Sequence, residues 1–420
     1  MHSKRAAPIL LLGKHQIKAL HDPVACTRLD ARDSKEPKIL LFSDLHNVPV
    51  GECDGVPMWS LEFLRMLDEL GSSEEPVVLG IEGELWHVGT LAAFESPESM
   101  PMIAQVYRDQ AASSTSVLQK VDYTLRRCVA LTSKEYRDAR VPPESACPLA
   151  NTKVLYAHIR EFGSAGRGAH LKRFYWDYLL LESLNFASAP WSTLLAQDAT
   201  QGEKRLNVWR SVLREVASAL DLSPASLLDE FKVAATNLCS FDKVKVEKAM
   251  FPSEPHSRAS LLTKELRRVE DAQAWKDQLT TYGQLDFQRA TFGEAEQKDQ
   301  DDIVQYVDVL FASLTKSATG KAKAVDLPRP SDSLLKLLIW AGAAYMDAYF
   351  LLRAFGKHQD SRVLCGFFGH AHIQCFVHFF ANIRETHTVG LFLDAGLFSG
   401  AEEVLEPRCL RATERDIRLA

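Results

Sequence analysis

Residues 38–47 read KILLFSDLHN, and this stretch determines the type of fold that the sequence predicts. Its apolar run is short and ends in a polar turn, which is typical of a buried β-strand. A helix is predicted over residues 58–67, where apolar residues recur at helical spacing and Gly71 follows. Residues 76–82, PVVLGIE, predict a second buried strand. Together these elements form a βαβ unit, whose two strands we expect to be parallel and adjacent.

The α/β pattern returns near the other end of the chain. Residues 362–368, RVLCGFF, and 388–393, TVGLFL, predict two further buried strands after a long helix over 332–357. Between them and the first strands, apolar residues follow the 3.6-residue period of helices over 117–129, 171–184, 206–220, 224–238, 261–279 and 303–314. The pattern at 154–158 and 244–251 leaves helix and strand open. The sequence therefore predicts an α/β fold: a mostly parallel sheet built from both ends of the chain, with a large helical insertion.

This organisation predicts four parts of the chain. A loosely ordered N-terminal arm is expected over 1–36, and an α/β core over 37–110 plus 331–400. The helical insertion is expected over 111–330, and a C-terminal tail over 401–420. Prolines at 328 and 330 mark the boundary before the long helix, with Ser331 or Ser333 as its N-cap.

The charge and cysteine content narrow the classes of function. The chain of 420 residues carries 49 Lys plus Arg against 55 Asp plus Glu, a net charge of −6 without a long basic run, so nucleic acid is not an expected partner. The eight cysteines are scattered and include no C-x-x-C pair, which predicts reduced thiols instead of disulfides or a structural zinc site. We therefore expect a cytoplasmic protein.

The most apolar long segment spans residues 334–352. Its length is near that of a membrane span, but Lys336 and Asp347 interrupt it. A buried core helix is the favoured interpretation, with no membrane span. Asp347 then needs a buried partner, which is either an active-site histidine or a structural ion pair within or between helices.

Polar residues that can carry chemistry follow the predicted strands. Asp44 and His46 follow the first strand, Glu82 and Glu84 end the second, and His370 and His372 follow the third. Ligands and catalytic groups gather beyond the carboxyl ends of parallel strands, so we expect these side chains to meet there.

Each of these residues also has a purely structural interpretation. Asp44 can cap the next segment with His46 as a surface group, and the two later histidines can simply begin a helix. Of the two glutamates, Glu82 is favoured as the inward group, because a carboxylate next to VVLGI is costly to bury without a partner. In the functional interpretation, His46, Glu82 and His370 are catalytic.

The same positions can also hold a metal ion. Asp44, His46, Glu82, His370 and His372 are then its ligands, with zinc or manganese as the expected ion. The two functional interpretations, a divalent metal site and metal-free acid–base chemistry, remain open at this point.

These motifs resemble two families. ILLFSDLH and FGHAH are similar to the first and last motifs of metallophosphoesterases, although the middle G-D and G-N-H motifs are absent. SDLHNVP, GIEGEL and FFGHAH resemble, in order, the three motifs of the erythromycin esterase, ChaN-like and Tiki/TraB-like group, with Ser43-Asp44 where that group usually has Gly-Glu. Either resemblance implies a hydrolase. A helix over 373–383 would favour the esterase-like group, and a strand there the degenerate phosphoesterase.

MDAYFLLRAF, followed by VLCGFFGHAHIQCFVHFF, is also similar to uncharacterised proteins of giant DNA viruses. That resemblance implies a location in the host cytoplasm or virion, but no activity. The leading hypothesis is a hydrolase acting on a small ester, a peptide or a phosphoester, with its oligomeric state open. The alternative is a non-catalytic viral structural or host-interaction protein, in which the histidines do not converge and an apolar patch is exposed within 111–325.

Overall fold

The computed structural model of the chain describes residues 10–21, 23–44, 53–84, 121, 125, 149–158, 175–186, 199–253, 261–292, 299–319, 327–328, 330–356, 361–394, 409–411 and 417–420. The protein is a mixed α/β protein, and its chain divides into two compact units. The first unit comprises Met1–Gly83, His87–His158 and Lys357–Ala420. The second comprises Glu84–Trp86 and Ile159–Gly356.

A six-stranded sheet with the order β10-β4-β5-β9-β7-β8 forms the centre of the first unit. Its strands are β4 (Ala25–Ala31), β5 (Lys38–Asp44), β7 (Val77–Glu84), β8 (Thr152–His158), β9 (Val363–Gly369) and β10 (His387–Asp394). The middle strands β5, β9 and β7 run parallel, whereas β4 is antiparallel to both β5 and β10. The predicted strands are confirmed as β5, β7, β9 and β10, and the undecided segment 154–158 lies in β8.

The expected adjacency of the first two predicted strands is wrong. Strand β9 lies between β5 and β7 and pairs in parallel with both. Every residue of β9 is buried, which explains its place: a strand that is apolar on both faces is stable only where the sheet is covered on both sides. The order of strands thus depends on a segment far away in the sequence.

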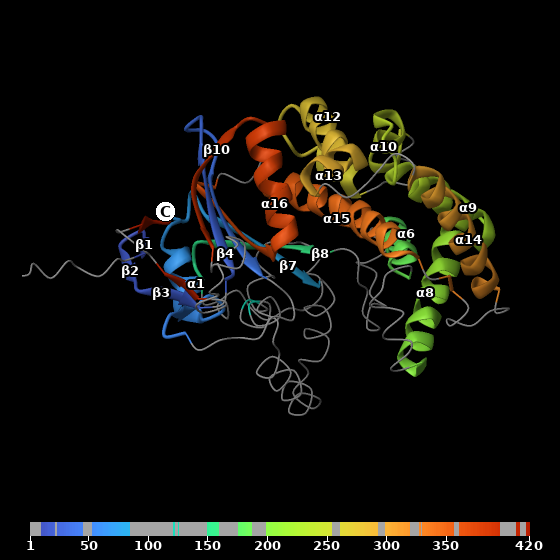
Figure 1. Ribbon diagram of the computed structural model, residues 1–420, viewed down its shortest axis with the longest axis horizontal. Coiled ribbons are helices and arrows are strands. Elements are labelled where there is room, and N and C mark those ends of the chain that lie inside the picture. The colour runs from blue at the N-terminus through green and yellow to red at the C-terminus, as the bar shows by residue number, and fades with distance from the viewer. Residues whose placement is uncertain are drawn as a thin grey trace, which may run out of the picture. The chain divides into compact units, whose positions relative to one another are not determined.

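Helices α1 (Leu61–Asp68) and α16 (His370–His378) cover opposite faces of this sheet (Figure 1). The ring of Phe63 on α1 lies 5.5 Å from that of Phe42 on β5, which stacks on Phe367 of β9. The next residue, Phe368, points to the other face and contacts Phe376 of α16 at 5.0 Å. The alternation of side chains therefore determines which residues of a strand face which helix.

Two small sheets each contain strands from the N-terminal and the C-terminal parts of the chain. One has the order β12-β1-β2 and consists of β12 (Ile417–Arg418), β1 (Leu10–Leu12) and β2 (His15–Ile17). The other has the order β11-β3-β6 and consists of β11 (Cys409–Arg411), β3 (Ala19–His21) and β6 (Val56–Pro57). Figure 1 shows the C-terminal end beside β1, as their pairing requires. Strands β1 to β4 therefore lie within the range predicted as a loosely ordered arm, and Leu10, Leu12 and Leu419 are fully buried.

The expectation that all cysteines are reduced thiols is also corrected here. Cys53 and Cys409 form a disulfide across 356 residues of sequence. The pairing of β3 with both β6 and β11 brings them together, which no spacing pattern in the sequence could indicate. Cys26, Cys239, Cys365 and Cys375 are free and buried.

The described part of the second unit is helical. Its helices are α6 (Tyr175–Asn185), α8 (Ala199–Ala219), α9 (Pro224–Leu238), α10 (Lys243–Met250), α11 (Leu261–Leu266), α12 (Ala272–Gly283), α13 (Leu285–Phe292), α14 (Asp299–Ala318) and α15 (Asp332–Ala354). Segment 244–251, left open by the sequence, is helical in α10, with Asp242 as the N-cap. The single helix expected over 261–279 is two helices, because Asp271 adopts a left-handed φ of 50° and caps α12. The predicted helix 117–129 lies almost wholly outside the described residues.

Helix α15 is the long apolar helix that the sequence predicted, and Ser331 is its N-cap. By length and composition it could cross a membrane, yet 72% of its apolar window is buried inside the protein. This burial agrees with the interpretation as a core helix. Strand β8 lies in the first unit, within the range 111–330 of the predicted insertion, and α15 lies in the second unit, within the range 331–400 of the predicted core.

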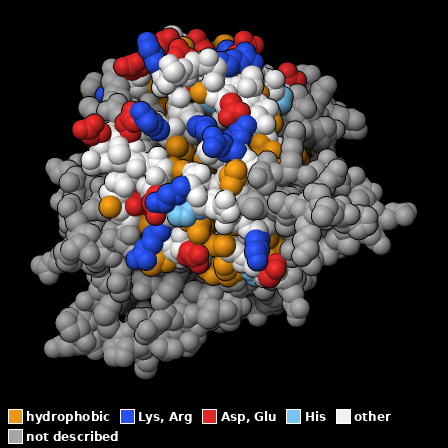
Figure 2. Space-filling view, turned by 90° about the vertical axis from the view of Figure 1, so that its left-hand side faces the viewer, with side chains coloured by type: hydrophobic (Ala, Val, Ile, Leu, Met, Phe, Trp, Pro, Cys, Tyr) orange, Lys and Arg blue, Asp and Glu red, His pale blue; other side chains and the backbone are white. Residues whose placement is uncertain are grey.

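The charges on one face can be followed in Figure 2. Over the described residues of this face, Lys and Arg side chains are interspersed with Asp and Glu side chains. A phosphate backbone would need a continuous basic surface. The mixed charges on this face agree with the net charge of −6.

Candidate functional site

The carboxyl ends of the three parallel strands lie together at one edge of the six-stranded sheet. Asp44 ends β5 and is paired with Gly369, which ends β9 and is the N-cap of α16. On the other side of β9, Glu82 directly follows Ile81 of β7, which pairs with Phe367 of β9. The residues that the sequence singled out on these strands therefore share one edge, as parallel pairing requires.

Glu82 makes two contacts at this edge. Its Oε2 accepts a hydrogen bond of 2.6 Å from the backbone N–H of Gly369, and its Oε1 lies 3.4 Å from Nε2 of His372. The side chains of Glu82 and His372 are only 8% and 9% exposed, so water screens this contact little. The carboxylate also lies at the N-terminal end of α16, where the helix dipole favours negative charge. Glu82 thus both caps the helix and holds the imidazole.

His370 begins α16 and points to the neighbouring strand. Its Nδ1 lies 3.3 Å from Oγ of Ser43 in β5. Ser43 is fully buried and pairs with Phe368, so it shares the sheet face of α16. The sequence analysis did not select Ser43, although its position directly before Asp44 at a strand end was visible.

Asp44 is buried, with 1% of its surface exposed. Because side chains alternate along a strand, Asp44 belongs to the face of Phe42 and α1, whereas Ser43 belongs to the face of α16. Glu82, His370 and His372 therefore lie on the face of the sheet that α16 covers, and Asp44 lies on the face that α1 covers. His46 lies outside the described residues, as does the side chain of Glu84.

The metal-binding interpretation can be compared with these positions. Three protein ligands of one ion must converge within a few ångströms. Among the described residues, the ligand atoms of Asp44, Glu82, His370 and His372 form no group of three that lie within 4.8 Å of one another. Zinc or manganese at this edge would thus require side-chain rotation or a further ligand.

Without a metal, the arrangement can still exchange protons. An imidazole gains and loses a proton near neutral pH, and a carboxylate that contacts one of its nitrogens fixes its orientation and stabilises the protonated form. The Glu82–His372 pair has this arrangement. His370, with a hydroxyl at its Nδ1, presents a second imidazole from the same helical turn.

Buried carboxylates in the second unit have different partners. Asp347 accepts a hydrogen bond of 2.6 Å from the hydroxyl of Tyr282, a partner that the sequence did not predict. Asp177 on α6 accepts from the hydroxyl of Tyr345 at 2.6 Å and from the backbone N–H of Leu261. Burial raises the pKa of Asp177 to about 7, and the two hydrogen bonds lower it in part. The sequence signal for both acids is the same, an Asp within an apolar helix.

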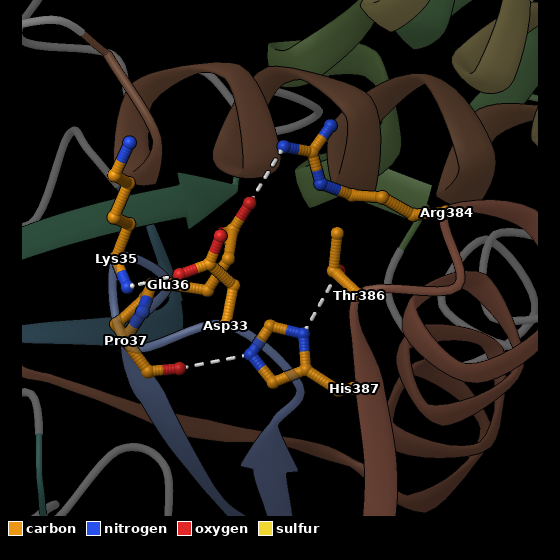
Figure 3. A network of polar contacts seen from close by, with 7 residues as sticks. All are labelled: Asp33, Lys35, Glu36, Pro37, Arg384, Thr386 and His387. Carbon is orange, nitrogen blue, oxygen red and sulfur yellow. Dashed lines mark hydrogen bonds and ion pairs between the residues drawn. The ribbon is translucent and has the colours of Figure 1, made fainter.

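His387 begins β10, an edge strand of the six-stranded sheet, and has a structural role there (Figure 3). Its Nε2 lies 2.8 Å from the carbonyl oxygen of Pro37, and its Nδ1 lies 2.9 Å from Oγ1 of Thr386. Beside it, Arg384 and Glu36 form an ion pair of 3.2 Å. Burial lowers the pKa of His387 below its usual value, while the Pro37 carbonyl opposes this shift. These contacts fasten the start of β10 to the turn between β4 and β5.

Comparisons with protein-family models, with curated proteins and with solved structures found no match to this chain. The function is therefore inferred from the chemistry of the residues at the sheet edge.

Proposed function

We propose that the chain is a hydrolase in which Glu82 and His372 form an acid–base pair at the carboxyl edge of the sheet. The observation that carries the proposal is the contact of 3.4 Å between Glu82 Oε1 and His372 Nε2, both nearly buried. Burial of a carboxylate beside an imidazole is costly unless the two interact, and the same contact favours proton uptake by the imidazole.

In this proposal, His372 removes a proton from the attacking water while Glu82 stabilises the resulting imidazolium. His370, oriented by Ser43, donates a proton to the leaving group. The proton gained by His372 returns to solvent, and His370 is reprotonated from solvent, so each cycle is balanced. A divalent ion, zinc or manganese, is the alternative way to activate the water at this edge.

The element after His372 supports the esterase-like resemblance over the phosphoesterase. Residues 370–378 form α16, and a π-helix over Phe379–Ile383 continues it, so a helix and not a returning strand follows the two histidines. We also propose that the helical residues between β8 and β9 are an insertion into an α/β core built from both ends of the chain. Its support is that β8 ends at His158 and β9 begins at Val363, yet both lie in one sheet.

The non-catalytic alternative predicts two features of the structure. It expects histidines that do not converge; His370 contacts Ser43 of β5, His372 contacts Glu82 of β7, and His46 lies outside the described residues. Its expected apolar patch has a partial counterpart in Val233, Val244 and Val309, which are 61%, 59% and 48% exposed. Single exposed valines are common on protein surfaces and do not by themselves mark an interface.

The test is a hydrolysis screen of the full chain with chromogenic carboxylic esters, a peptide panel and phosphoesters. Glu82→Gln keeps a carbonyl oxygen for the Gly369 N–H but loses the charge, so we expect kcat/KM to fall about 10²–10⁴-fold. His372→Asn should cause a similar loss. Asp347→Asn, in the second unit, is the matched control and should keep the activity.

Each outcome decides between the alternatives. Full activity of Glu82→Gln and His372→Asn at wild-type folding, judged by circular dichroism, would overturn the proposal. The absence of hydrolysis by the wild type in all three substrate classes, before and after incubation with zinc or manganese, would favour the non-catalytic alternative. Activity that appears only with added metal would replace the metal-free pair by the metal site.

A further inference from the structure

A second group of potential ligands lies at the small sheet β11-β3-β6 and includes none of the residues of the Glu82–His372 site. The two sulfur atoms of Cys53 and Cys409 and a carboxylate oxygen of Asp54 all lie within 4.8 Å of one another. Cys53 and Asp54 directly precede the turn into β6, and Cys409 begins β11. Cys53 and Asp54 are neighbours in the sequence, and Cys409 lies 356 residues after Cys53. The three potential ligands of one ion thus come from two distant segments.

The backbone holds these residues in place independently of the sulfur atoms. Strand β3 pairs in parallel with β6 and antiparallel with β11, and the register places Cys409 directly opposite His21. Gly55 follows Asp54, and a Cβ there would lie 2.6 Å from the carbonyl oxygen of Ala19 in β3. Only glycine allows this close approach, which fixes the Cys53-Asp54 segment against β3.

The sulfur atoms are joined as a disulfide in this structure. A disulfide sulfur is a poor metal ligand, because thiolates are the groups that bind zinc. Reduction would free two thiols whose Cα atoms are 5.7 Å apart and remain held by the β3 ladders. We infer that Cys53, Asp54 and Cys409 form a redox-controlled zinc site, closed as a disulfide under oxidising conditions and able to bind the ion when reduced.

The ligand set is suited to zinc. Two thiolates select soft or borderline ions such as Zn²⁺ over Mg²⁺ and Ca²⁺, and a carboxylate is a common third ligand. A tetrahedral ion keeps a fourth position, which water can fill. Asp54 is exposed and Cys53 half-buried, so the ion and a reductant can reach the site from solvent.

Three of the free cysteines in the described part of the chain have a different environment. Cys26 and Cys239 are completely buried, and burial raises the pKa of each thiol to about 12. Burial raises the pKa of Cys365 still further, with the neighbouring Cys26 adding to the effect. Thiols in such surroundings stay protonated and unreactive. The difference in accessibility makes the Cys53–Cys409 pair the redox-active thiols among the described cysteines.

The chemistry of the switch is balanced in electrons and protons. A small dithiol reduces the disulfide: the S–S bond breaks, each protein sulfur gains one electron and one proton, and the dithiol leaves as its cyclic disulfide. Binding of Zn²⁺ then releases the two thiol protons. A peroxide reverses the process, taking two electrons from the two thiolates and two protons from solvent to form two waters, while the S–S bond re-forms and Zn²⁺ is released.

The experiment titrates Zn²⁺ into the full chain after reduction by a dithiol that is then removed under anaerobic conditions, with a chromogenic chelator as competitor. Substitution of Zn²⁺ by Co²⁺ gives a second readout, because thiolate-to-cobalt charge transfer absorbs in the near ultraviolet. We expect one zinc per chain in the reduced protein, none at this site in the oxidised protein, and release upon addition of hydrogen peroxide.

Variants identify the ligands. Cys53→Ser and Cys409→Ser should each lower the zinc affinity at least 100-fold and remove the charge-transfer band, and Asp54→Asn should lower the affinity about tenfold. Cys239→Ala is the matched control, because it removes a buried thiol and should leave the stoichiometry at one. Equal zinc binding by the oxidised and reduced wild type, or unchanged binding by both cysteine variants, would overturn the inference.

The zinc site can be tested even if a cysteine variant misfolds. The wild type itself provides the comparison, because the oxidised and reduced forms differ only at the thiols. Zinc should also protect the reduced thiols of Cys53 and Cys409 from alkylation, as measured by peptide mass spectrometry. Alkylation at the same rate with and without zinc would count against the site. The inference does not depend on the proposed hydrolase, since none of these readouts measures hydrolysis.

Discussion

Glu82 in the first compact unit and two aspartates in the second are buried beside different kinds of partner. In the first unit, Glu82 contacts the imidazole of His372 at the end of a strand. In the second, Asp177 and Asp347 accept hydrogen bonds from tyrosine hydroxyls between helices. A tyrosine hydroxyl keeps its proton at neutral pH, whereas an imidazole exchanges one. Burial of an acid is therefore no sign of function by itself, and the chemistry of its partner separates a structural acid from a candidate catalytic one.

The largest effect is expected from Asp177→Ala in the second unit. The substitution leaves the hydroxyl of Tyr345 and the N–H of Leu261 buried without this acceptor. We expect the free energy of unfolding to fall by roughly 2–6 kcal/mol, at about 1–3 kcal/mol for each such group. Urea denaturation measures the loss. Tyr345→Phe, which removes one of the two hydrogen bonds, should cost less, and equal stability of the wild type and the alanine variant would contradict a structural role.

The pH dependence of the second unit should also be due to Asp177. Its pKa is raised from 3.8 to about 7 in the folded protein, so the folded state binds a proton more tightly than the unfolded chain. The contribution of this group is complete below about pH 4 and is lost as the pH rises toward 7, at no more than about 1.4 kcal/mol per pH unit. Urea denaturation between pH 4 and pH 8 tests this, and Asp177→Asn should lack the dependence. An identical pH profile of both proteins would exclude Asp177 as its source.

Glu82 should affect stability less than Asp177 does. Glu82→Ala removes the acceptor of the Gly369 N–H and should lower the free energy of unfolding by roughly 1–3 kcal/mol. Glu82→Gln keeps an acceptor and should cost about 1 kcal/mol or less. Thermal and urea unfolding of both variants provide the values. A loss as large for glutamine as for alanine would mean that the charge mainly stabilises α16, which would weaken the contrast with the second unit.

The first unit should have a smaller pH dependence of the opposite sign. The pKa of His387 is lowered from 6.5 in the folded protein, so the unfolded chain takes up this proton first. The stability that His387 provides is therefore present above about pH 6.5 and decreases as the pH falls through this value toward the folded pKa. Hydrogen exchange of the β10 amides between pH 5 and pH 8 should show faster local opening at the acidic end. In His387→Asn this acceleration should be absent.

The smallest effect is expected at the surface of the second unit. Lys232 and Asp308 form an ion pair of 2.8 Å between α9 and α14, with side chains that are 38% and 50% exposed. Solvent screens such a pair, so Lys232→Ala should change the free energy of unfolding by about 0–1 kcal/mol. A double-mutant cycle with Asp308→Ala isolates the interaction. A coupling above this range would show that exposed pairs matter as much here as the buried acids.

Much of the local structure follows from the sequence. The apolar runs of β5, β7 and β9 and the helical period of α9 and α14 are local signals, since each depends on neighbouring residues. The N-cap Ser331 is predictable for the same reason. The sequence also placed Glu82, His370 and His372 at strand ends, and their shared edge follows from parallel pairing alone.

Other features depend on contacts between distant segments. The place of β9 between β5 and β7, the pairing of β1, β3 and β4 with C-terminal strands and the Cys53–Cys409 disulfide all need partners that lie hundreds of residues away. The expected adjacency of β5 and β7 is wrong because adjacency in sequence does not fix adjacency in a sheet. The N-terminal strands were not predicted because such short strands gain their stability from the C-terminal segments that pair with them.

The sequence by itself thus determined the α/β class, the three parallel strands β5, β7 and β9, most of the described helices and the residue types at the sheet edge, because apolar periodicity and strand ends depend on neighbouring residues. Only the tertiary structure decided that Glu82 contacts His372 while Asp44 belongs to the other face, because a one-residue step along a strand reverses the side chain. It also decided the tyrosine partners of Asp177 and Asp347, since helix packing brings together side chains that share no local pattern.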